Sequence, residues 1–155
     1  MPLSKLPDAE AQCAQLAELI RPQLQANTLL VGIHSGGAWI ARRLNELLGL
    51  PGEIGLVDVS FYRDDFGAKG LHPQVKPTSI PFDVEGRSLI LVDDVLYTGR
   101  TTRAAINELF DYGRPASIKL AVLADRGGRE LPICAQFCVW HAELGAREEL
   151  VLEPD

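Results

Sequence analysis

Two adjacent acids and a threonine-rich turn give this chain of 155 residues its clearest chemical signal. Asp93 and Asp94 directly follow the apolar run SLILV at residues 88–92, which is typical of a strand buried on both faces. In an open α/β sheet, ligands bind beyond the carboxyl ends of the strands. We therefore expect both acids at an exposed strand end, where two carboxylates suit the neighbouring hydroxyls of a sugar or a magnesium ion.

The turn after the acids has the composition of a phosphate site. Thr98, Thr101 and Thr102 offer hydroxyl donors, and Gly99 lets the backbone approach a ligand closely. A helix is expected over residues 101–112, and its first turn has free backbone amides and the positive end of the helix dipole. This one segment could therefore hold a ribose together with its 5′-phosphate.

Other kinds of protein also place paired acids after an apolar strand. ATPases do so to hold magnesium, but they require a GxxxxGK[ST] loop, and this sequence contains none. Receiver-like domains carry paired acids and have no use for a phosphate turn directly after them. A purely structural capped helix would not require both acids. A ligand site is therefore the better interpretation.

The rest of the chain alternates strand-like apolar runs with helical periodicity. Such alternation predicts an α/β fold, with an open, mostly parallel sheet flanked by helices, as a single domain over residues 1–155. The first helix begins after Asp8 and ends or kinks at Pro22, and the tail from Gln136 adds one or two short strands. We expect the other strands at residues 28–33, 54–62, 88–92 and 118–123, and the other helices at residues 38–48 and 101–112.

Residues 63–81 have no clear period and several glycines and prolines. A structureless stretch of about twenty residues is longer than a compact domain usually contains, and such loops are often lids over a ligand. We therefore expect a long flexible loop here, in which Arg63 could meet phosphate oxygens.

Charge and composition restrict the partners. The chain has 15 basic and 21 acidic residues, a net charge of −6, so binding to RNA would require a local basic patch. No apolar run approaches the ~18–20 residues of a membrane helix, and the N-terminus lacks a secretory signal, which predicts a cytoplasmic protein without a membrane partner. Three cysteines argue against a disulfide framework. Cys134 and Cys138 would lie about 13 Å apart on a strand, which disfavours a zinc site with His141.

Residues 92–102 resemble the 5-phosphoribosyl 1-diphosphate (PRPP) signature of type I phosphoribosyltransferases. Four segments in order resemble the PyrR family of pyrimidine operon attenuators with uracil phosphoribosyltransferase activity, over roughly residues 31–136. They are FYRDD at residues 61–65, LVDDVLYTGRTTRAAINEL at 91–109, GRP at 113–115 and LAVLADRGGRELPI at 120–133. The resemblance implies that uracil and magnesium-bound PRPP give UMP and pyrophosphate, and it suggests a homo-oligomer, a dimer or larger.

The resemblance also implies a role for each group of residues. Asp93, Asp94 and Arg63 would be catalytic, with the two acids acting directly or through the magnesium bound with PRPP. The pyrophosphate loop would be His34, Ser35, Gly36 and Gly37. The residues that bind PRPP and its phosphate would be Val95, Leu96, Tyr97, Thr98, Gly99, Arg100, Thr101 and Thr102. The nucleobase would lie beside Asp125, Arg126, Arg129, Leu131 and Ile133.

Two alternative functions remain open at this point. The first is an RNA-binding regulator that keeps the nucleotide site as a UMP sensor with little turnover. The second is a phosphoribosyltransferase that uses a purine, because the PRPP signature does not choose the base. Arg42, Arg43, Arg100, Arg103 and Arg114 are the candidates for a basic RNA-binding face. With only four lysines in the chain, we expect such binding to be weak or absent.

Overall fold

The computed structural model describes residues 8–59 and 78–141. Arg63, most of the long loop and the tail after His141 lie outside the described residues. Leu56 and Ser79, which lie before and after the undescribed segment 60–77, exchange two backbone hydrogen bonds of 2.8 Å each. In the described part of the chain, no helix is long and apolar enough to cross a membrane.

Five parallel strands form one sheet in the order β2-β1-β3-β4-β5. The prediction of an open parallel sheet flanked by helices is confirmed. The strands are β1 (Thr28–Ile33), β2 (Gly55–Val57), β3 (Ser88–Leu96), β4 (Ser117–Asp125) and β5 (Phe137–His141).

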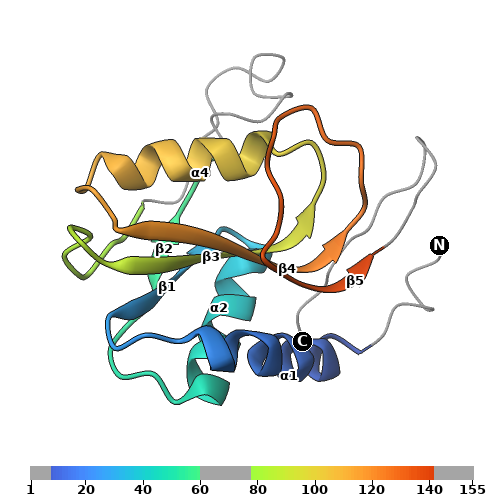
Figure 1. The fold of residues 1–155 in the computed structure, drawn as a ribbon, viewed down its shortest axis with the longest axis horizontal. Coiled ribbons are helices and arrows are strands. Elements are labelled where there is room, and N and C mark those ends of the chain that lie inside the picture. Colours follow the sequence, from blue (N-terminus) through green and yellow to red (C-terminus); the bar gives the residue numbers. More distant parts are fainter. Residues whose placement is uncertain (1–7, 60–77, 142–155) are drawn as a thin grey trace.

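Helices cover both faces of the sheet. In Figure 1, α4 (Arg100–Phe110) lies on one face, while α1 (Ala9–Ile20) and α2 (Gly36–Leu48) lie on the other. Asp8 caps α1 by accepting a hydrogen bond from the Ala11 amide, as expected, and a short 3₁₀ turn, η2 (Arg21–Gln23), follows at Pro22. Gly49 ends α2 in the left-handed conformation, with φ of 65°.

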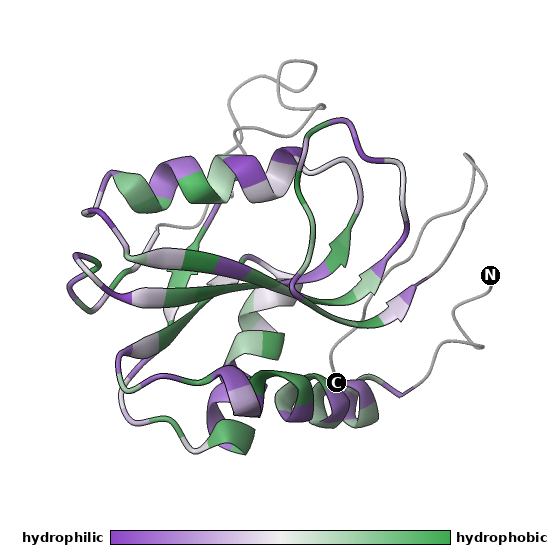
Figure 2. Cartoon of the chain, viewed as in Figure 1, coloured by the Kyte–Doolittle hydropathy of each residue, from purple (hydrophilic) through white to green (hydrophobic). Residues whose placement is uncertain are grey.

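Alternate residues of the central strands build the two halves of the core. Leu30 of β1 and Ile90 of β3 pack with α1 and α2, whereas Val31 and Leu91 pack on the side of α4. All four side chains are 3% exposed or less. Figure 2 accordingly shows green and white along much of the sheet, with purple and green alternating along α4. A strand buried on both faces is continuously apolar, which is why these runs were recognisable in the sequence.

Several element boundaries differ from the sequence predictions, and α4 and β4 do so by only one or two residues at each end. Helix α2 begins at Gly36 rather than residue 38, and β2 covers only Gly55–Val57. Strand β3 does not end at Val92 but continues to Leu96, because its ladder with β4 continues to the pair Leu96 and Asp125. The acid pair therefore lies inside a strand, and the expected exposed strand end is wrong: Asp93 is only 9% exposed.

The strand order places a topological switch point between β1 and β3. The chain leaves β1 toward β2 through α2 on one face, and it leaves β3 toward β4 through α4 on the other face. Ligands of such sheets bind at the switch point, outside the carboxyl ends of the strands. The acid pair and the glycine turn after β1 both lie at this point.

Candidate functional site

The turn after β1 packs directly against the acid pair through its glycines. A Cβ on Gly37 would lie 2.2 Å from the carbonyl oxygen of Val92, and a Cβ on Gly36 would lie 2.5 Å from Asp94 Oδ2. Only glycine permits this approach. Strand β1 pairs with β3 only as far as Val92, so the start of α2 fills the space beside the part of β3 that extends further.

The two acids are oriented by the backbone that follows each of them. Asp93 Oδ1 accepts a hydrogen bond of 2.9 Å from the Asp94 amide, and Asp94 Oδ1 accepts one of 2.8 Å from the Val95 amide. Each carboxylate therefore keeps an oxygen that its own backbone bond does not use. Asp94 is half-buried and lines a cavity, which makes it the more accessible of the pair.

One cavity of about 310 Å³ contains the acids and the whole predicted phosphate-binding segment. Thr102 is buried, at 3% exposure, and Thr98 Oγ1 accepts a hydrogen bond of 3.1 Å from the Arg100 amide. Gly99 is the N-cap of α4, with φ of 95°, a conformation that favours glycine. The lining residues are Asp93, Asp94, Val95, Leu96, Tyr97, Thr98, Gly99, Arg100, Thr101 and Thr102.

Two helix N-termini are present at this site. Within the described residues, Ser35 makes no side-chain capping bond to α2, and Gly99 has no side chain with which to cap α4. First-turn amides without a capping side chain are suited to bind an anion, and the helix dipole adds to the attraction. The site can therefore receive two phosphate groups, one at each helix, with two carboxylates between them.

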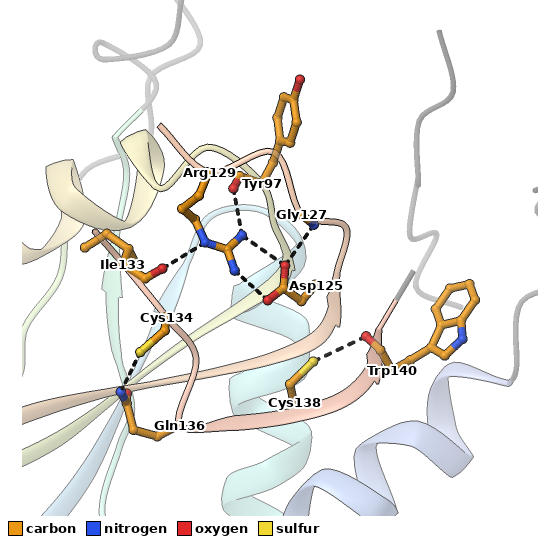
Figure 3. Close-up of polar contacts among 9 residues, drawn as sticks. All are labelled: Tyr97, Asp125, Gly127, Arg129, Ile133, Cys134, Gln136, Cys138 and Trp140. Carbon is orange, nitrogen blue, oxygen red and sulfur yellow. Dashed lines mark hydrogen bonds and ion pairs between the residues drawn. The ribbon is translucent and has the colours of Figure 1, made fainter. Parts of the chain in front are cut away.

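The predicted base-binding residues lie in a loop after β4, the base loop (residues 125–133). This loop packs on the phosphate-binding segment (residues 95–102). Asp125 ends β4, and its carboxylate accepts bonds of 2.9 and 2.6 Å from the two terminal nitrogens of Arg129. Figure 3 shows this fork, with the same guanidinium reaching the carbonyls of Tyr97 and Ile133. The hydrogen bonds from Arg129 hold the pKa of Asp125 below the ordinary value of an aspartate.

The predicted site residues thus fall into three connected groups. Gly36 of the pyrophosphate loop contacts Asp94, and the acids share a cavity with the phosphate-binding segment. The base loop contacts that segment at Gly99, where a Cβ would lie 3.1 Å from Ile133. Arg63 lies outside the described residues. Glu130, which was not among the predicted site residues, forms an ion pair of 2.7 Å with Arg100; an acidic residue in a loop gives no specific sequence signal.

The two acids have the ligand chemistry that a hard cation such as magnesium prefers, but two carboxylates are too few to hold the ion alone. Carboxylate oxygens are good magnesium ligands, and magnesium commonly takes one or two of them together with substrate phosphates and water. Within residues 8–59 and 78–141, no three His, Cys, Asp or Glu side chains gather closely enough to hold a metal ion. Asp93 and Asp94 therefore fit a magnesium ion that arrives with a phosphorylated substrate.

Comparison with known proteins identifies the family. The phosphoribosyl transferase domain family matches residues 3–146. The bifunctional protein PyrR of Ralstonia nicotianae is 53% identical, over 96% of this chain and 87% of its own length. The protein of the same name from Pseudomonas fluorescens is 47% identical, over 95% and 90%.

Solved structures of hypoxanthine phosphoribosyltransferases share the fold. The Trypanosoma cruzi protein is 26% identical, with a TM-score of 0.65, over 85% of this chain and 72% of its own. The Staphylococcus aureus protein is 21% identical, with a TM-score of 0.66 and the same two coverages. Fold, site and sequence agree: the chain belongs to the phosphoribosyl transferase family and, within it, to the PyrR proteins.

Proposed function

We propose that this phosphoribosyltransferase joins uracil to the ribose of PRPP, producing UMP and pyrophosphate. A bond forms between a uracil ring nitrogen and C1′ as the bond from C1′ to the pyrophosphate oxygen breaks, and the ring N–H proton is released. The observation that carries the proposal is that the acid pair and the N-terminus of α4 line one cavity. Its dimensions and donors suit a ribose with a 5′-phosphate.

The acid pair holds the ribose. Asp94 faces the cavity and accepts hydrogen bonds from the ribose hydroxyls, while buried Asp93 fixes the backbone of its neighbour. Magnesium bound with PRPP would be held by these two carboxylates and would neutralise charge on the departing pyrophosphate. The chain itself positions the reactants and forms no covalent bond with them, so it needs no activated nucleophile.

The phosphates occupy the two helix N-termini. The hydroxyls of Thr98, Thr101 and Thr102 and the first amides of α4 bind the 5′-phosphate, which does not react. The amides of the pyrophosphate loop at residues 34–37 bind the leaving group. Their fixed dipoles stabilise charge as it develops. The backbone of the base loop, residues 125–133, reads the edge of the uracil ring.

A radiolabel assay tests this proposal directly. PRPP and magnesium are incubated with labelled uracil, hypoxanthine or guanine, and nucleotide formation is measured. We expect UMP to form at least about tenfold faster than either purine nucleotide, and EDTA to stop the reaction. Faster formation of a purine nucleotide would show that the substrate is that purine and not uracil. No turnover with any of the three bases would contradict the enzymatic proposal.

The relatives are called bifunctional, so RNA binding is the second candidate function. Two of the five candidate arginines already have carboxylate partners: Arg43 pairs with Glu10, and Arg100 pairs with Glu130. Binding of RNA by these arginines would break both ion pairs. The chain has a net charge of −6, which disfavours binding to RNA phosphates. We therefore propose that specific RNA binding is weak or absent.

Filter binding to a pyrimidine-operon leader RNA, with and without UMP at two salt concentrations, tests this prediction. We expect no specific binding below about micromolar concentration and a shallow salt dependence. The variant Arg42→Ala/Arg43→Ala probes the local patch, and Arg21→Ala removes an arginine from the exposed pair with Glu18 as a control. Nanomolar binding that UMP strengthens and that the Arg42/Arg43 variant alone removes would contradict it.

A further inference from the structure

The base loop is hydrogen-bonded to three consecutive carbonyls of the phosphate-binding segment. The Arg126 amide donates to Leu96 O at 3.0 Å, and the amides of Glu130 and Leu131 both donate to Thr98 O, at 2.9 and 3.1 Å. The middle carbonyl, that of Tyr97, accepts from a side chain instead, at 2.8 Å from Nη1 of Arg129. Arg129 thus completes an unbroken row of contacts between the two segments.

The Arg129 guanidinium connects three parts of the chain at once. Nη1 and Nη2 bind Asp125 at the end of β4, Nη1 also binds Tyr97 O, and Nε binds Ile133 O at 2.8 Å. Strand β4 has a neighbour on each side, and Asp125 pairs with Leu96 of β3 and His141 of β5, so Asp125 is a fixed point of the sheet. The side chains of Arg129 and Asp125 are 26% and 14% exposed, so solvent screens this pair less than it screens a surface ion pair.

The other side-chain contacts between the base loop and the phosphate-binding segment are expected to hold the two segments together less firmly. The pair of Arg100 and Glu130 is about half exposed on each side and is expected to contribute little. Tyr97 packs its ring against the Gly128 backbone and under Arg126, whose guanidinium lies 4.1 Å from the ring centroid, but these contacts fix the ring and not the carbonyl. Arg129, by contrast, binds both segments and the end of β4 together.

We propose that Arg129 is a positioning residue: it holds the phosphate-binding segment and the base loop in one arrangement, so that the affinity for PRPP depends on a side chain that touches no substrate. This inference rests on the proposed function, because PRPP is taken as the ligand. It differs from the role as a base-binding residue that the sequence resemblance implies, because four of the guanidinium's five N–H donors bind groups of the protein. Asp125 shares this role as the anchor of Arg129.

Arg129→Lys is the informative variant because it retains the positive charge. An ammonium donates from a single nitrogen and cannot reproduce the planar fork that reaches Asp125, Tyr97 O and Ile133 O together. The 5′-phosphate does not react, so a displaced phosphate-binding segment weakens substrate and transition state equally. We expect the KM for PRPP to rise about tenfold with kcat within about twofold of the wild type.

Two further measurements separate positioning from simple loss of folding. Urea unfolding of Arg129→Lys is expected to remain close to the wild type, and a change in folded fraction alone would lower kcat and leave KM unaltered. Amide hydrogen exchange in the free protein is expected to be about tenfold faster at Glu130 and Leu131, whose amides bond to Thr98 O. Asp125→Asn is expected to act through the same contacts and so add little to Arg129→Lys.

Arg21→Ala is the matched control, since Arg21 likewise binds a carboxylate, Glu18, and a backbone carbonyl, Leu47 O, but at the opposite end of α2 from the site. It is expected to leave the KM for PRPP unchanged. An unaltered KM in Arg129→Lys, or unaltered exchange at Glu130 and Leu131, overturns the inference. The exchange measurement uses no substrate, so it remains decisive even if the wild-type protein fails to convert uracil.

Discussion

Asp93→Asn combined with Asp94→Asn is expected to lower kcat/KM for PRPP by at least about a thousandfold while the protein still folds. Asparagine keeps the carbonyl oxygen that accepts the following backbone amide, so the local bonds at Asp93 and Asp94 are retained. The substitution removes two negative charges that lie side by side, which relieves their mutual repulsion. What is lost is the pair of carboxylates that, in the proposed function, bind the ribose hydroxyls and magnesium.

Initial rates and urea unfolding of the same preparations measure this prediction. Asp111→Asn is the control, since it removes one exposed acid at the opposite end of α4 from the site. It should retain wild-type kinetics. Near-normal turnover in the double variant would show that the acid pair is not the catalytic site. A large loss of stability would instead show that buried Asp93 serves the fold.

The fold was predictable because its information is local to each strand. Continuous apolar runs mark the buried strands β1 and β3, and the helical periods between strands imply parallel pairing. The end of β3 was not predictable in this way, since the acids interrupt the apolar pattern. Only the ladder to β4, with Asp93 beside Val122, shows that the strand continues.

The clustering of the candidate site residues was predictable where these residues are contiguous in sequence. The acids and the threonine turn are neighbours in sequence, and they line one cavity. The contacts that connect distant segments left no such signal: nothing in the sequence indicates that Gly36 lies against Asp94 or that Arg129 binds Tyr97 O. Opposite charges four residues apart at Asp125 and Arg129 were visible, but in a loop that spacing implies no contact.

The contact between Gly36 and Asp94 leads to the second large expected effect. In Gly36→Ala, the new Cβ would lie 2.5 Å from Asp94 Oδ2 and 2.8 Å from its Cγ, so the carboxylate must move. The obstruction is a side chain, and alanine is favourable in a helix, so the fold should tolerate the change. We expect kcat/KM to fall about a hundredfold because the carboxylate leaves its working position, with thermal stability close to the wild type.

Gly37→Ala provides the structural contrast. Its Cβ would lie 2.2 Å from the backbone carbonyl oxygen of Val92, which cannot swing aside, so α2 itself must shift away from β3. We therefore expect Gly37→Ala to lose both stability and activity, whereas Gly36→Ala loses activity alone. Thermal unfolding and steady-state kinetics on both variants distinguish the two cases. Equal destabilisation by both would contradict the assignment.

A double-mutant cycle determines whether Gly36→Ala acts through the carboxylate. If the alanine harms only the position of Asp94, adding it to Asp94→Asn should cost less than about twofold more in kcat/KM, because the same interaction cannot be lost twice. A further loss of about a hundredfold in the Asp94→Asn background would show that Gly36→Ala disturbs something else, namely the amides at the start of α2. The pyrophosphate loop would then act through its backbone donors, independently of the acid that it touches.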